Sequence, residues 1–171
     1  MSFQNFVDQH QNKGYTTNYQ SSNDGTIVCK ENVSKYIYKY KSGEKFMRVQ
    51  IDGGLISDQN TPKCDYLLLN YTRKNETPHY HSIFIELKGS DVIHACEQIS
   101  KTIEQVGNKL TGSILHARIV ASKISDTKIQ INKKKEEFMK KYQCFLFCQC
   151  RLMEEESDKN GFPIHSRYRG N

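Results

Sequence analysis

The segment from residue 82 to residue 122 constrains the fold more than any other part of the chain. Residues 82–88 are mostly apolar and end at Gly89, and a second apolar run covers residues 114–122. Between them, apolar residues recur at alternating spacings of four and three, which is typical of an amphipathic helix. These residues are Val92, Cys96, Ile99, Ile103, Val106 and Leu110. The order strand, helix, strand predicts a mixed sheet with helices packed on its faces.

The residues before this segment also have strand character. Tyr36, Tyr38 and Tyr40 alternate with Ile37 and Lys39, although a helix ending at Gly43 is an alternative for residues 31–40. Strands are then expected over residues 45–56 and 64–71, separated by a loop at 57–62. Gly53-Gly54 predicts a bulge or a close backbone approach. A further loop is expected over residues 73–78.

The rest of the chain completes an α/β protein. Residues 133–142 predict a charged helix and residues 144–152 a last buried strand. A chain of 171 residues is the size of one domain. We therefore predict one domain over residues 27–153, preceded by a polar, partly ordered arm (1–26) and followed by a basic tail (154–171). Within the arm, Phe3, Phe6 and Val7 could form a short helical face.

Composition indicates an intracellular protein with a polyanionic partner. The six cysteines lack an accompanying secretory signal, which favours reduced thiols and a cytoplasmic location. No run approaches the roughly 20 apolar residues that span a bilayer, so no membrane association is expected. The formal net charge of +6 suits nucleic acid.

Three charged residues form the best candidate site. Glu86 and Lys88 project from the same face of the strand at residues 82–88, because side chains alternate along a strand. Asp65 begins the preceding apolar run. In an antiparallel hairpin, registers that oppose Asp65 to Glu86 or to Lys88 put all three side chains on one face, and a slip of one residue would not. Two neighbouring carboxylates suit a hard divalent cation such as Mg²⁺.

At these residues the chain resembles a known group of enzymes. Residues 63–69 (Lys-Cys-Asp-Tyr-Leu-Leu-Leu) and 84–89 (Phe-Ile-Glu-Leu-Lys-Gly) are similar to the signature of the PD-(D/E)xK nuclease superfamily, which includes many restriction endonucleases. The resemblance covers residues 45–122, and Cys64 replaces the usual proline. It implies a restriction-endonuclease-like fold: a helix, a three-strand meander carrying the motif on its second and third strands, a helix and a further strand.

The resemblance also implies roles for individual residues. Asp65 and Glu86, with the main-chain carbonyl of Leu87, would bind Mg²⁺ or Mn²⁺. Lys88 would hold or deprotonate the attacking water, or pair with the phosphate. The superfamily often adds an acidic residue, for which Glu31 and Asp52 are the candidates, and a glutamine on the following helix. That glutamine would be Gln98, unless it simply lies on the wet face of its helix.

The expected activity is hydrolysis of phosphodiester bonds in DNA, in restriction, defence or repair. By analogy with the superfamily, a homodimer would bring two sites to the two strands of a duplex. Lysines 133–135, 140 and 141 contact phosphates or form a solvated helix face. The alternatives to a nuclease are an inactive nucleic-acid- or protein-binding module that keeps the fold, and an enzyme acting on another phosphate ester.

Overall fold

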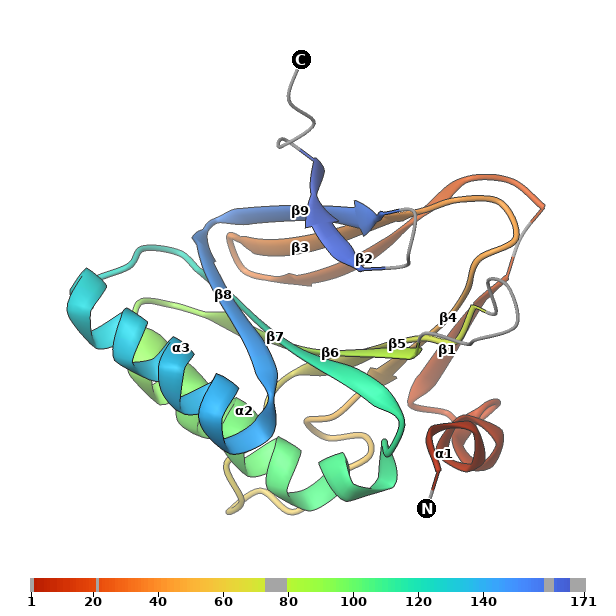
Figure 1. Cartoon of the computed structure of the whole chain (residues 1–171), viewed down its shortest axis with the longest axis horizontal. Coiled ribbons are helices and arrows are strands. Elements are labelled where there is room, and N and C mark those ends of the chain that lie inside the picture. The colour runs from red at the N-terminus through yellow and green to blue at the C-terminus, as the bar shows by residue number, and fades with distance from the viewer. Residues whose placement is uncertain (1, 21, 73–79, 159–161, 167–171) are drawn as a thin grey trace.

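The computed structural model describes residues 2–20, 22–72, 80–158 and 162–166, so the loop predicted at 73–78 lies outside the described residues. The described residues form three α-helices, one 3-10 helix and ten strands (Figure 1). The helices are α1 (Phe3–His10), α2 (Val92–Val106), η1 (Gly107–Lys109) and α3 (Lys128–Tyr142). The strands are β1 (Thr16–Gln20), β2 (Gly25–Glu31), β3 (Ser34–Tyr40), β4 (Lys45–Gln50), β5 (Tyr66–Asn70), β6 (Tyr80–Lys88), β7 (Ser113–Ala121), β8 (Cys144–Cys150), β9 (Leu152–Ser157) and β10 (Pro163–His165).

The main sheet has six strands in the order β1-β4-β5-β6-β7-β8. Neighbouring strands from β1 to β6 run antiparallel, whereas β6, β7 and β8 run parallel. Helix α2 makes the crossover from β6 to β7 and α3 the crossover from β7 to β8. The predicted mixed α/β architecture is confirmed, and so are the strands expected on both sides of α2.

A second sheet, in the order β10-β9-β3-β2, covers one face of the main sheet (Figure 1). The helices lie on the other face, which gives three layers. Strand β6 shows the consequence of this arrangement. Its odd-numbered residues Ile83, Ile85 and Leu87 pack between the two sheets, whereas Phe84 belongs to the core on the helix side. Glu86 and Lys88 lie on the same face of β6 as Phe84, because side chains alternate along a strand, so they project towards the helices.

Local signals explain where the two crossover helices begin. The Asp91 side chain caps α2 by accepting a hydrogen bond from the His94 amide (2.8 Å). Thr127 and Gln130 form a capping box at the start of α3. Helix α3 therefore begins at Lys128, before the predicted residue 133.

The predicted polar arm is wrong for residues 16–20, whereas the short helical face expected at Phe3, Phe6 and Val7 is present as α1. Helix α1 buries Phe3, Phe6 and Val7 in the core, and β1 pairs with β4 at the edge of the main sheet. Strand β1 is polar because an edge strand is largely exposed, which is why its sequence resembles a disordered arm.

The predicted tail is also wrong over its first part, because β9 and β10 belong to the second sheet. The predicted strand over residues 45–56 ends earlier, at Gln50, and a turn follows. In that turn a Cβ at Gly54 would overlap the main-chain carbonyl of Gln50. The close backbone approach predicted at Gly53-Gly54 is confirmed.

All six cysteines are free thiols, and Cys29, Cys64, Cys96 and Cys144 are buried. Within the described residues, no helix has the length and apolar character needed to cross a membrane.

A buried ion pair joins the two sheets. Arg118 of β7 donates from Nε to Oε1 of Glu155 on β9 at 2.8 Å, and both side chains are almost fully buried. Tyr36 of β3 donates to the other Glu155 oxygen, also at 2.8 Å. Arg118 further donates to the Phe145 carbonyl of β8 (2.9 Å). The pair therefore connects β3, β7, β8 and β9.

We expect Arg118→Met to lower the free energy of unfolding by about 3–5 kcal/mol, because it leaves Glu155 buried without its counterion. The double variant Arg118→Met/Glu155→Leu removes both charges and should recover at least half of that loss. Urea denaturation followed by circular dichroism measures both values. A double variant as unstable as Arg118→Met would contradict the assignment of the loss to an uncompensated charge.

Candidate functional site

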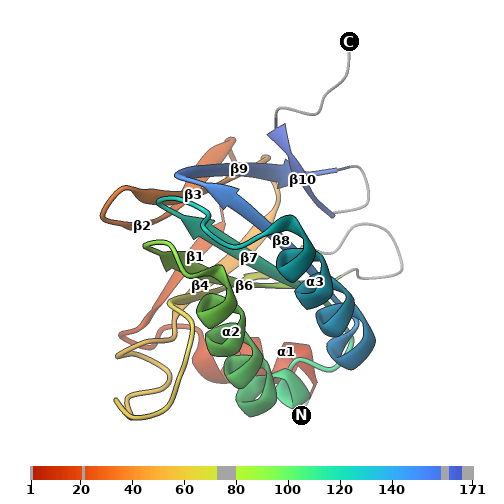
Figure 2. The ribbon, with the colours of Figure 1, turned by 90° about the vertical axis from the view of Figure 1, so that its left-hand side faces the viewer.

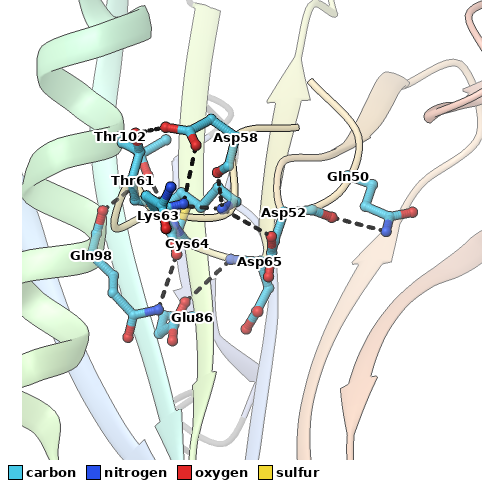
Figure 3. A network of polar contacts seen from close by, with 11 residues as sticks. Gln50, Asp52, Asp58, Thr61, Lys63, Cys64, Asp65, Glu86, Gln98 and Thr102 are labelled. Carbon is cyan, nitrogen blue, oxygen red and sulfur yellow. Dashed lines mark hydrogen bonds and ion pairs between the residues drawn. The ribbon is translucent and has the colours of Figure 1, made fainter. Parts of the chain in front are cut away.

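The register of β5 and β6 brings Asp65 and Glu86 together at one end of the main sheet. Tyr66 pairs with Ile85, so Asp65, which directly precedes β5, lies beside Glu86. The Asp65 amide donates to Oε2 of Glu86 (3.2 Å), and the Leu87 amide donates to Oδ2 of Asp65 (2.7 Å). Each carboxyl group therefore accepts a hydrogen bond from the main chain of the other strand, and Figure 3 shows the one from the Asp65 amide to Glu86.

Lys88 and Gln98 complete the group on the helix side. Lys88 Nζ lies 3.6 Å from Oε1 of Glu86 and donates to Oε1 of Gln98 at 2.5 Å. Gln98 Nε2 donates to the main-chain carbonyl of Lys63 (3.0 Å). The four residues predicted for catalysis are thus brought together, because α2 packs on the face of β6 from which Glu86 and Lys88 project.

The two carboxyl groups are held in a site that is short of positive charge. Burial raises the pKa of Glu86 to about 9, the negative charge of Asp65 adds to the shift, and the Lys88 ammonium opposes it. Burial also raises the pKa of Asp65 to about 6, helped by the charges of Glu31 and Asp52 and opposed by the Leu87 amide. A cation between Asp65 and Glu86 would relieve both effects.

Glu31 and Asp52 act on this site through their charge. Glu31 is the last residue of β2, so the helix considered for residues 31–40 is wrong. Asp52 is largely exposed (61%) and pairs with Lys63 Nζ at 3.2 Å. Within the described residues, neither Glu31 nor Asp52 hydrogen-bonds to Asp65 or Glu86. The structure therefore places both near the centre and outside its hydrogen-bonded group.

The donor set fits Mg²⁺ better than a transition metal. Across the part of the chain that the structure describes, no group of three or more His, Cys, Asp or Glu side chains could hold a metal ion. Mg²⁺ usually takes only one or two protein carboxylates and keeps several waters. Asp65 and Glu86 supply that number of carboxylates.

Three supporting residues were missed in the sequence. Thr102 accepts a hydrogen bond from the Cys64 amide (2.9 Å) and donates to the Gln98 carbonyl (2.9 Å), which ties α2 to the start of β5. Lys63 provides the carbonyl that orients Gln98. Ser34 donates to the Lys88 carbonyl (3.2 Å). Of these three residues, only Thr102 could have been found from the sequence, because it lies one helical turn after Gln98 on the same face of the helix.

A pocket of about 240 Å³ lies at the carboxyl end of β6. The turn between β2 and β3 forms one wall, and the end of β6 and the residue after β7 form the other. The lining residues are Glu31, Asn32, Val33, Ser34, Leu87, Lys88, Gly89 and Ser122. Lys88 therefore contributes to a wall of this pocket, and its side chain is 24% exposed.

Among models of protein families, curated proteins and solved structures, none matches this chain. What the site can do follows from its own geometry and chemistry.

In metal-free buffer, the stability of the protein should depend on pH through Glu86. The pKa of this carboxyl is about 9 in the folded protein and 4.5 ordinarily, so the folded state binds the proton more tightly. Its contribution is then complete below pH 4.5 and is lost as the pH rises towards about 9.

Chemical denaturation of the wild type and Glu86→Gln across this range, in EDTA, tests the assignment. The stability of the wild type relative to Glu86→Gln should fall steadily as the pH rises. A difference that stays constant with pH would show that Glu86 does not carry the dependence.

Proposed function

We propose that this protein is a metal-dependent nuclease that hydrolyses phosphodiester bonds in DNA on a restriction-endonuclease-like fold. The observation that carries the proposal is the register that sets Asp65 beside Glu86, with Lys88 on the same face of β6. This is the arrangement that the PD-(D/E)xK resemblance implies for two metal ligands and a lysine near the attacking water.

The order of elements supports the same proposal. Strands β4, β5 and β6 form an antiparallel meander, α2 crosses over, and β7 lies parallel to β6. The superfamily core has this order from its first strand onward, with the motif on its second and third strands. Asp65 directly precedes the second strand of the meander, and Glu86 and Lys88 end the third.

Asp65 and Glu86, with the Leu87 carbonyl, would hold Mg²⁺ or Mn²⁺. Such an ion, when bound, stabilises negative charge on a phosphate and lowers the pKa of a bound water. Asp65 is fixed by the Leu87 amide and Glu86 by the Asp65 amide, so both carboxyl groups are oriented before any ligand arrives.

Lys88 is positioned to act on water or on the phosphate. An ammonium group carries three N–H donors, of which one is used by Gln98 and one faces Glu86. The third remains for a water or a phosphate oxygen. Gln98 fixes the direction of this group, because its amide nitrogen is held by the Lys63 carbonyl and its oxygen therefore faces Lys88.

We expect cleavage of plasmid and linear DNA with Mg²⁺ or Mn²⁺, lowered at least about 100-fold by Asp65→Asn, Glu86→Gln or Lys88→Met. Each change removes charge while keeping the shape of the side chain. Lys109→Met, in η1, is the matched control and should cleave like the wild type. Cleavage that survives both Asp65→Asn and Lys88→Met would refute the proposal.

Titration calorimetry separates a nuclease from an inactive binding module with the same fold. The wild type should take up Mn²⁺, and Asp65→Asn/Glu86→Gln should not. If the wild type takes up no divalent ion, the binding module is the better description.

We further expect Gln98→Ala to lower kcat about 10-fold with little change in KM, because the substitution frees Lys88 to leave its position without removing a charge. Steady-state cleavage of a labelled oligonucleotide measures both constants. An unchanged kcat would place Gln98 on the solvated face of α2 with no part in the reaction.

A further inference from the structure

Basic residues collect at the end of the molecule that holds the site. The β2–β3 turn and the connections after β6, β7 and β8 all lie at this end, which faces the viewer in Figure 2. Main-chain hydrogen bonds link them: Lys123 to Gly89 (3.1 Å), Arg151 to Ala121 (2.7 Å) and Lys35 to Arg151 (2.8 Å). Lys30 pairs with Lys35 across β2 and β3. We call Lys88, Lys123, Arg151, Lys35 and Lys30 the basic arc.

The charge of the arc is largely uncompensated. Lys30, Lys123 and Arg151 are exposed and Lys35 is half-buried. Among the described residues, none of these four forms an ion pair. The lysines of α2 and α3 are partly paired, since Lys101, Lys134 and Lys141 each pair with a glutamate.

Lys30 and Lys35 stand directly opposite each other in the sheet. Like charges in this position destabilise a strand pair. Folding therefore gains nothing from placing two lysines here, whereas a bound anion would offset their repulsion.

Arg151 has a backbone conformation that favours glycine. Its φ is 61°, at the point where the chain leaves β8 and enters β9 of the second sheet. Such a conformation is unfavourable for a residue with a long side chain. The Arg151 side chain is exposed at this turn, so its guanidinium group is available to a ligand.

The arc begins at the catalytic centre. Lys88 faces Glu86, and the pocket at the end of β6 is bounded by Lys88, Gly89 and the β2–β3 turn. Lys30 and Lys35 flank that turn, and Lys123 follows Ser122, which also lines the pocket. Of the five cations, Lys88 lines the pocket itself, whereas Lys30, Lys35 and Lys123 are each next in sequence to a lining residue.

We propose that the basic arc binds the sugar–phosphate backbone of a nucleic-acid strand and leads it to Asp65 and Glu86, an inference that rests on the proposed nuclease function. Lysine and arginine side chains neutralise phosphates and release their counterions, so such a surface makes binding strongly dependent on salt. The partially paired lysines of α2 and α3 are a weaker surface for the same ligand.

The test is fluorescence anisotropy of a labelled single-stranded DNA and a labelled duplex, in EDTA, over a series of salt concentrations. Lys123→Gln/Arg151→Gln should weaken binding roughly 10-fold at fixed salt and lower the slope of log K against log salt by about 1.4 for the single strand or about 1.8 for the duplex. Lys45→Gln/Lys109→Gln is the charge-matched control. Both lysines are exposed and lie at the opposite end of the sheet. Lys45 is the first residue of β4, and Lys109 ends η1, shortly before β7.

A second pair of variants separates folding from binding. Arg151→Gly relieves the backbone and should keep or raise Tm while it weakens binding. Gln143→Gly relieves a similar φ of 51° at the far end of β8 and should keep affinity unchanged. Loss of affinity in Arg151→Gly with an unchanged or higher Tm cannot be attributed to unfolding.

Equal weakening by the arc and control pairs, an affinity unchanged in Lys123→Gln/Arg151→Gln, or a wild type that binds neither DNA would overturn the inference. The same experiments distinguish failure of this inference from failure of the proposed nuclease function. Binding that depends on the arc without any metal-dependent cleavage would keep the surface and refute the nuclease. Cleavage that depends on Asp65, together with DNA binding that is unchanged by the arc substitutions, would support the nuclease and refute the role of the arc.

Discussion

The pairing of β5 with β6 is the constraint on which the rest of the site depends. Its register sets Asp65 beside Glu86, and each carboxyl group accepts a main-chain hydrogen bond from the opposite strand. A slip by one residue would turn the apolar side chains of one strand away from their core and separate the two carboxyl groups. The two cores on either side of the sheet therefore enforce the geometry of the site, because Leu67 and Phe84 must face the helices while Leu68 and Ile83 face the second sheet.

The buried charges between the two sheets are balanced differently from those of the site. Between the sheets, Arg118 and Glu155 neutralise each other, and Tyr36 satisfies the second carboxylate oxygen. At the end of β6, one partly exposed lysine faces two carboxyl groups whose pKa values burial raises. Buried charge that is compensated holds the layers together, whereas buried charge left partly uncompensated marks the place where a ligand would bind.

The sequence predicted the parts of the fold that have strong periodic signals. The stripe of α2 and the apolar runs on both sides of it predicted the crossover, and strand alternation predicted the common face of Glu86 and Lys88. Polar elements could not be found in this way. Strand β1 lies at an edge and β9 carries Glu155 into the interior, so both sequences resemble solvent-exposed segments. Contacts such as Ser34 with Lys88, or Arg151 with Lys35, join residues far apart in the chain and depend on the second sheet, which the sequence did not predict.

The charge distribution around the site explains why a cation and the basic arc would be needed together. Burial is the main cause of the raised pKa of Asp65, and the negative charges of Glu31 and Asp52 add to it. A phosphate would be repelled at this point if it approached alone. The arc attracts a polyanion over a distance of about a Debye length, roughly 8–10 Å in ordinary salt, but it does not change the sign of the charge at the carboxyl groups. A divalent cation does so locally. Long-range attraction and local charge reversal are therefore separate tasks: Lys123 and Arg151 serve the first, and the carboxyl groups of Asp65 and Glu86 serve the second by holding the cation.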